Sequence, residues 1–96
     1  PVDTTAPTVA ITSPLNGALV PRNTTMTITA SASDNVGVTR AEFFINGSLH
    51  CTDLSAPYSC AWRVPPPRGR TYRLQAKAYD ARNNVGTSAI VTVTSR

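Results

Sequence analysis

The sequence predicts an all-β domain, an antiparallel β-sandwich of about seven short strands. Apolar and polar residues alternate with period two in residues 25–33 and 71–79, which is typical of strands with one buried face. Turn sequences rich in Gly, Pro, Asn and Asp separate such segments at intervals of about 8–12 residues. No window shows the i, i+3, i+4, i+7 spacing of an amphipathic helix. Because single hairpins cannot bury their apolar faces, two sheets should stack.

Length and composition are those of one globular domain. The chain has 96 residues, of which 41% are hydrophobic and 15% charged. No apolar run approaches the roughly 20 residues of a membrane span. The first residues do not resemble a signal peptide, but a segment of a longer secreted chain would also lack one. We expect residues 1–7 to be an extended linker and residues 8–96 to form the domain.

Residues 40–47 show the expected arrangement most clearly. In an extended strand, one side would carry the inward set Ala41, Phe43 and Ile45, and the other would carry Arg40, Glu42 and Phe44. Asn46-Gly47 favours a type I′ turn, in which both residues take positive φ. We therefore predict a central strand that ends in a tight hairpin.

The segments before this strand fit an edge and a long strand. Residues 8–12 predict a short strand, residues 13–17 a turn, and residues 19–20 a small contact beside Pro21. The strand over residues 25–33 would place these side chains inward: Met26, Ile28, Ala30 and Ala32.

The segments after it complete the two sheets. Residues 49–53 return from the hairpin, and the next strand faces inward with Tyr58, Cys60 and Trp62. Residues 65–69 form a stiff connection that crosses between the sheets. The strand over residues 71–79 buries Tyr72, Leu74, Ala76 and Ala78. Residues 80–86 are expected to be a loop, and the last strand should bury Ala89, Val91 and Val93.

The two cysteines are interpreted as a pair. If a hairpin is centred between Ser55 and Ala56, Cys51 lies directly opposite Cys60, close enough for a disulfide. Such a short loop gives about 2–3 kcal/mol and implies an oxidising compartment. The alternative is two free buried thiols in a reducing compartment. A metal site is disfavoured because His50 is the only histidine and no CxxC spacing exists.

A family resemblance rests on a series of short motifs in a specific order. They are residues 3–9, 11–14 with Asn16-Gly17, 32–38, 42–47, 56–58, Trp62, 76–80 and 84–86. With these motifs the chain resembles the bacterial immunoglobulin-like (Ig-like) modules repeated in large secreted proteins, over almost its whole length. Two features depart from that pattern: the Cys51–Cys60 pair, and the proline run 65–67 where a softer turn is usual.

The resemblance implies both a fold and a setting. Such modules occur in extracellular glycoside hydrolases, proteases, lyases and adhesins, usually beside a catalytic or binding domain. We therefore expect a non-catalytic, secreted or cell-surface accessory module, a rigid spacer of a polymer-degrading hydrolase. The alternatives are an auxiliary module that binds carbohydrate or another surface polymer, and an adhesin repeat stiffened by calcium. Expected partners are neighbouring domains of the same chain and such a polymer, with no nucleic acid, no membrane and a monomeric state.

The first candidate site is a calcium site at one pole. In this topology the turn at Asp34 and Asn35 and the loop at Asp80 and Asn84 should meet there, with the linker around Asp3 entering nearby. Carboxylate and amide oxygens are the ligands that calcium prefers. The alternative is that these side chains cap their own turns by bonding to backbone amides.

The second candidate site is a sugar-binding face. Phe44 and Tyr79 should point outward on neighbouring strands. A flat ring there could stack on a sugar, while polar groups bond its hydroxyls. Nearby charged residues would be Arg40, Arg73 and Lys77. The alternative is that the rings pack across strands and contact an adjoining module.

The charge pattern assigns no partner by itself. The net charge is +4, and the local concentration is Arg63, Arg68, Arg70 and Arg73. No nucleic-acid-binding motif accompanies it, and a solvated surface that carries net charge for solubility is the favoured interpretation. A hydrolase triad needs a base, and the single histidine lies beside Cys51, so catalysis is not expected.

Overall fold

The computed structural model describes residues 6–34 and 37–96, and these form a sandwich of two β-sheets. The smaller sheet has the order β1-β3-β6, with β1 Thr8–Ser13, β3 Thr25–Ser33 and β6 Tyr58–Arg63. The larger sheet has the order β2-β9-β7-β4-β5, and β8 also pairs with β7. Its strands are β2 Leu19–Val20, β9 Val91–Ser95, β7 Thr71–Asp80, β4 Val38–Ile45, β5 Ser48–Asp53 and β8 Val85–Thr87. The predicted all-β sandwich is confirmed.

The core lies between the sheets and follows the predicted alternation. In β7, four inward side chains are buried: Tyr72, Leu74, Ala76 and Ala78. The smaller sheet supplies Ile28, Ala30, Tyr58, Cys60 and Trp62. Across the core, the rings of Trp62 and Tyr72 meet edge to face with centroids 5.1 Å apart, a favoured aromatic arrangement.

The central hairpin has the predicted turn. Strand β4 lies between β7 and β5, and Phe43 is 1% exposed. Asn46 and Gly47 take φ values of 53° and 84°, as a type I′ turn requires. One irregularity in the register follows Phe43, which pairs with Cys51, whereas Phe44 pairs with Leu49. His50 is therefore an extra residue in β5, a β-bulge.

The hairpin predicted around the cysteines is wrong. Strand β5 pairs with β4 in the larger sheet, whereas β6 pairs with β3 in the smaller one. The turn over residues 54–57 therefore passes from one sheet to the other. The predicted disulfide is present, but it joins the two sheets instead of two paired strands. A disulfide between the two sheets is also found in antibody domains, where it joins another pair of strands.

The last strand also differs from prediction. Val85 and Gly86, expected in a loop, belong with Thr87 to β8, which pairs with Lys77–Tyr79 of β7. Strand β9 then pairs with residues 71–74 of β7, so β8 and β9 follow the same edge with a gap at residues 88–90. Ser88 fills the gap, because its Oγ accepts from the Ala76 N–H at 2.8 Å and its N–H donates to the Ala76 carbonyl. Ala89, predicted as core, is exposed as a result.

Strand β2 departs from a purely antiparallel sandwich. Leu19 and Val20 pair in parallel with Thr94 and Ser95 of β9, at the edge of the larger sheet. Val20 is 2% exposed and joins the core, whereas Leu19 points to solvent and is 63% exposed.

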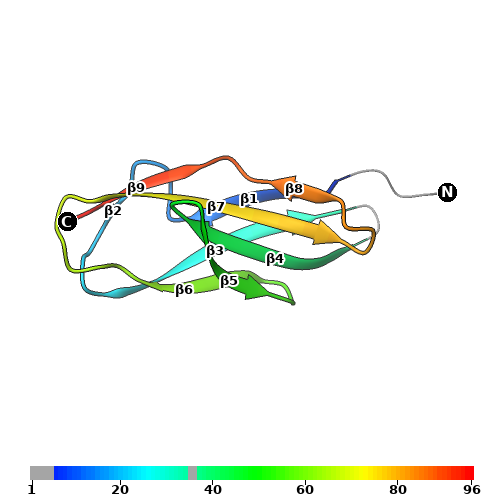
Figure 1. Cartoon of the computed structure of the whole chain (residues 1–96), viewed down its shortest axis with the longest axis horizontal. Helices are drawn as coiled ribbons and strands as arrows, with labels where there is room; N and C mark the ends of the chain where they lie inside the picture. Colours follow the sequence, from blue (N-terminus) through cyan, green and yellow to red (C-terminus); the bar gives the residue numbers. More distant parts are fainter. Residues whose placement is uncertain (1–5, 35–36) are drawn as a thin grey trace.

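The molecule is elongated, with principal extents of 51 × 19 × 19 Å. The described chain enters β1 at one end of the long axis, and β9 finishes at the opposite end (Figure 1). Pro7, placed in the linker by the sequence, is buried. Its carbonyl lies so close to Gly86 of β8 that a Cβ on that glycine would overlap it.

Candidate functional site

The outer surface of β4 and β7 brings together most of the predicted binding residues. In the ladder between these strands, Arg40 is opposite Tyr79, Glu42 is opposite Lys77, and Phe44 is opposite Gln75. Because cross-strand neighbours share a face of the sheet, their side chains are adjacent. We call Arg40, Glu42, Phe44, Lys77 and Tyr79 the aromatic face.

Cations cover the rings of the aromatic face. The guanidinium carbon of Arg40 lies 3.8 Å from the centroid of the Tyr79 ring, and Lys77 Nζ lies 5.0 Å from that of Phe44. Both are cation–π geometries, and both rings are only partly exposed. A sugar could therefore stack on the covered side of Tyr79 only after Arg40 moved away.

Glu42 organises the charges of this face, although the sequence analysis left it outside the site. Its Oε2 lies 3.8 Å from Arg40 Nε, and its side chain also bonds the Tyr79 hydroxyl. That hydrogen bond, together with partial burial, raises the pKa of Tyr79 above 10.0. The alternation of residues 40–45 could have revealed Glu42, because it shares the outward side with Arg40 and Phe44.

Arg73 lies nearer the start of β7 than Tyr79 and than Gln75, the partner of Phe44. It lines an open groove of about 450 Å³ together with Asn46, Gly47, Gln75 and Ile90. Its backbone is tied to the hairpin, because Arg73 N–H donates to Asn46 Oδ1 and Asn46 N–H donates to the Arg73 carbonyl, both at 2.8 Å. The predicted set is therefore divided between the aromatic face and this groove.

The residues predicted to bind calcium include Asp34, which follows β3, and Asp80, which ends β7. We call this end of the molecule the acidic pole. Asp80 is 1% exposed, and its Oδ1 accepts from the N–H groups of Arg82 and Asn84 at 2.9 Å. Its Oδ2 accepts from Asn84 Nδ2 at 2.9 Å. Asp34 Oδ2 accepts from Gly37 N–H at 3.3 Å, and Asn35 lies outside the described residues. These bonds are those of turn capping, the alternative to a metal site, and calcium binding stays a prediction.

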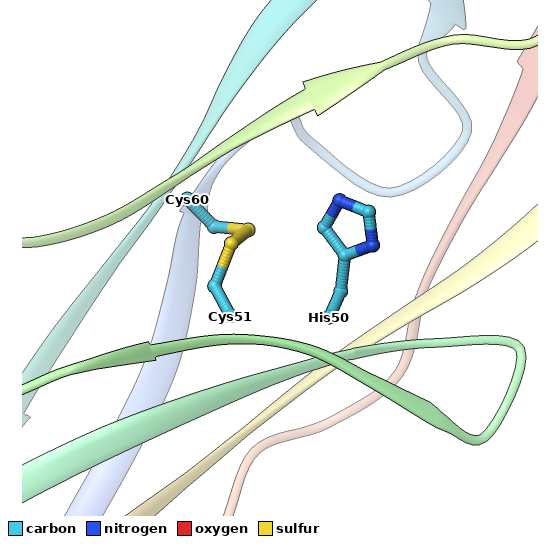
Figure 2. A group of neighbouring side chains, drawn as sticks. All are labelled: His50, Cys51 and Cys60. Atoms are coloured by element: carbon cyan, nitrogen blue, oxygen red, sulfur yellow. A yellow bond between two sulfur atoms is a disulfide. The ribbon is translucent and has the colours of Figure 1, made fainter.

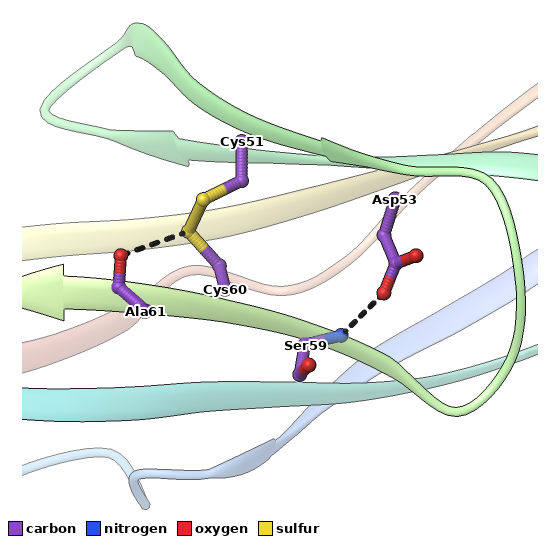
Figure 3. Close-up of a disulfide and its surroundings, with 5 residues drawn as sticks. All are labelled: Cys51, Asp53, Ser59, Cys60 and Ala61. Carbon is purple, nitrogen blue, oxygen red and sulfur yellow. Dashed lines mark hydrogen bonds between the residues drawn. A yellow bond between two sulfur atoms is a disulfide. The ribbon is translucent and has the colours of Figure 1, made fainter.

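The β5–β6 margin carries the disulfide and the single histidine. The Cys51–Cys60 bond has its Cα atoms 5.8 Å apart. Figure 2 shows the His50 ring beside it, and the candidate ligand atoms of the three residues lie within 4.8 Å of one another. Metals bind thiolates, and both sulfurs are held in the disulfide. Asp53 adds a second link, because its Oδ2 accepts from Ser59 N–H at 3.0 Å (Figure 3).

The fold and these surfaces define an immunoglobulin-like β-sandwich module. The model of the bacterial Ig domain family matches residues 7–94, so the chain belongs to this family. Members of such module families are generally non-catalytic. No curated protein sequence matches the chain.

Two solved structures are similar in fold. Fibronectin(III)-like modules of Clostridium thermocellum CbhA match with a TM-score of 0.81 and 24% identity, over 91% of this chain and 93% of theirs. A Jonesia denitrificans lytic polysaccharide monooxygenase matches with a TM-score of 0.55 and 16% identity, over 86% of this chain and 60% of its own. A disulfide in a bacterial Ig-like module suggests an extracellular or surface location. Within residues 6–34 and 37–96, no helix has the length and apolarity needed to span a bilayer.

Proposed function

We propose that the chain is a non-catalytic accessory module of a larger secreted bacterial protein, in which it acts as a rigid spacer. The observation that carries this proposal is the placement of the chain ends. The chain enters and leaves at opposite ends of a molecule that is 51 Å long and 19 Å wide (Figure 1). Neighbouring domains would thus be held apart along the long axis.

The sandwich is closed along both of its long margins, where an edge of one sheet meets an edge of the other, and this supports a rigid module. The β5–β6 margin is linked by a disulfide and by Asp53, and the opposite margin is packed where Pro7 meets Gly86. Covalent and close-packed links between sheets oppose the sliding that would bend a sandwich. The resemblance to modules of secreted hydrolases supports a polymer-degrading enzyme as the larger protein.

The spacer role is tested by measuring the distance between the two ends. Fluorescent donor and acceptor dyes attached near Ala6 and Arg96 should give one narrow distance distribution by single-molecule energy transfer. A Gly/Ser chain of equal length is the flexible control, and its distribution should be broad. A broad distribution for the folded module would contradict the rigid-spacer proposal.

The aromatic face supports a second candidate function, binding of an insoluble polysaccharide. Two partly exposed rings lie among hydrogen-bonding groups on neighbouring strands, as a sugar platform requires. A pulldown with insoluble polymer tests this, and Phe44→Ala and Tyr79→Ala should each reduce retention. Arg82→Ala, on the loop beyond β7, is the matched control. Retention unaffected by either ring substitution would remove the stacking idea.

A further inference from the structure

A group of arginines gathers at the end of the molecule where β9 finishes. The sequence placed Arg63, Arg68 and Arg70 near one another, and the topology adds two more. Arg22 follows β2, which pairs with the end of β9, and Arg96 follows β9 directly. All of them are exposed. We call Arg22, Arg63, Arg68, Arg70 and Arg96 the basic pole.

The connection over residues 67–70, which carries Arg68 and Arg70, is held in place by Ser95, a residue that is only 3% exposed. Ser95 Oγ accepts from Arg70 N–H and donates to the Pro67 carbonyl, both at 2.9 Å. Its backbone also bonds Gly69 and Arg70. The connection that carries Arg68 and Arg70 is therefore held against β9 before any ligand binds.

The turn that carries Arg22 and Asn23 is also held in place by hydrogen bonds to neighbouring segments. Arg22 N–H donates to the Arg96 carbonyl at 3.1 Å, and Asn23 N–H donates to the Val64 carbonyl at 2.8 Å. The Arg63 guanidinium is oriented by a 2.8 Å bond to Asn23 Oδ1. Because the backbone of both turns is ordered in advance, binding of a ligand would restrict the arginine side chains but would not have to order the turns that carry them.

The described side-chain carboxylates lie more than a screening length from the backbone of this pole. Glu42 is opposite Lys77, and Asp53 bonds Ser59, which is four residues or about 13 Å along β6 from Arg63. Lys77 is six residues along β7 from Thr71, about 20 Å at the rise of a strand. Asp34 and Asp80 are farther still, at the other end of β3 and β7. Because charges are screened over about 8 Å at physiological salt, the basic pole presents a net positive field.

The surroundings of the basic pole favour a polyanion without bases. Phe43, Tyr58, Trp62 and Tyr72 are buried, and Phe44 and Tyr79 lie on the aromatic face, which accounts for every aromatic residue. A nucleic-acid site would normally add stacking rings or a helix for a groove. Arginine pairs well with carboxylate and sulfate oxygens.

We propose that the basic pole binds an acidic polysaccharide, a linear glycan that bears carboxylate or sulfate groups. This activity is separate from the spacer role and does not depend on it. It assigns a partner to the arginine concentration seen in the sequence.

The test compares two charge-matched variants on polygalacturonate, a carboxylated glycan, by affinity electrophoresis. Arg68→Gln/Arg70→Gln and Arg82→Glu each lower the net charge by two, and Arg82 belongs to neither the basic pole nor the aromatic face. The first should weaken binding about tenfold and the second less than about twofold. Binding of the unchanged protein should also fall about tenfold between 50 and 200 mM salt. Equal effects of the two variants would overturn the proposal.

Two further arms settle the class of ligand. A neutral galactan of matched length should not bind, and duplex DNA of matched charge should bind more weakly than polygalacturonate. Equal binding of either one would overturn the assignment to an acidic polysaccharide. Arg22→Gln/Arg96→Gln removes the same charge from the other turn and should repeat the loss, which keeps the test decisive if one variant misfolds. Melting curves confirm that each variant is folded.

Discussion

The two long margins of the sandwich are closed by different means. At the β5–β6 margin, a disulfide and the Asp53–Ser59 bond connect the sheets. At the opposite margin, the backbone of Pro7 packs against Gly86 so closely that no side chain fits between them. The first margin is linked through side chains, whereas the second depends on direct contact of main chains. The backbone contact should therefore be the less forgiving of the two.

The largest effect is expected at the backbone contact. Gly86→Ala would drive a Cβ into the Pro7 carbonyl, and main-chain atoms on both sides leave little room to adjust. We expect the free energy of unfolding to fall by about 3 kcal/mol, measured by urea denaturation. Thr87→Ala at the neighbouring exposed position should change it by less than about 0.5 kcal/mol. A Gly86→Ala protein as stable as the parent would show that this margin yields easily.

The disulfide margin should come next. Its bond closes a short loop, with a sequence separation of 9. Reduction should lower the free energy of unfolding by about 2.5 kcal/mol, because the unfolded chain regains the conformations the loop had excluded. Thermal unfolding with and without a thiol reductant measures this. The Cys51→Ala/Cys60→Ala protein is the control and should not respond to reductant.

A smaller effect is expected where Ser88 bridges β8 and β9. Ser88→Ala would leave the Ala76 N–H without the acceptor it now has, in a buried position. The expected cost is about 1–2 kcal/mol by urea denaturation. Exposed Ser31→Ala, in the other sheet, should have almost no effect. Equal values for the two would mean that the gap between the strands is not held by this hydroxyl.

The smallest effect is expected on the aromatic face, which belongs to neither margin. The pKa of Tyr79 is raised above 10.0 in the folded protein by its hydrogen bond with Glu42. The unfolded chain therefore loses this proton first, so the stability from Tyr79 is complete below pH 10 and disappears as the pH passes the folded pKa. As the pH rises above 10.0, Tyr79→Phe should lose less stability than the unchanged protein. Parallel curves would contradict the Glu42 bond.

How much could be predicted from the sequence depends on how far apart along the chain the interacting residues lie. Alternation assigned the inward faces of β3, β4, β6 and β7, because it depends only on neighbouring residues. It could not say which strands pair, so residues 54–57 were interpreted as a hairpin turn although they pass between sheets. The cysteine pairing survived this error because both arrangements bring Cys51 near Cys60. The requirement for glycine at position 86 depends on Pro7, nearly 80 residues earlier, and has no local signal.

The candidate surfaces show the same limit. Phe44, Tyr79, Arg40 and Lys77 were placed on one face because they take outward positions in the alternation of two neighbouring strands, β4 and β7. The stacking of cations on the rings depends on side-chain rotamers that the alternation does not specify. Arg22 and Arg96 were not connected with Arg68, since only the parallel pairing of β2 with β9 brings them together. In the alternation of β9, Ser95 takes the inward position after Val91 and Val93. A polar residue at this core position was the one sign in the sequence that the end of β9 makes specific hydrogen bonds.

The position of the disulfide has a mechanical consequence. If the module is pulled by its two ends until it unravels, residues 51–60 cannot lengthen while the sulfurs remain bonded. The Cα atoms of Cys51 and Cys60 stay 5.8 Å apart across a sequence separation of 9. When fully stretched, the oxidised protein should therefore be about 25 Å shorter than the reduced one. In a force spectrometer, each unravelling event would thus record the redox state of that one molecule.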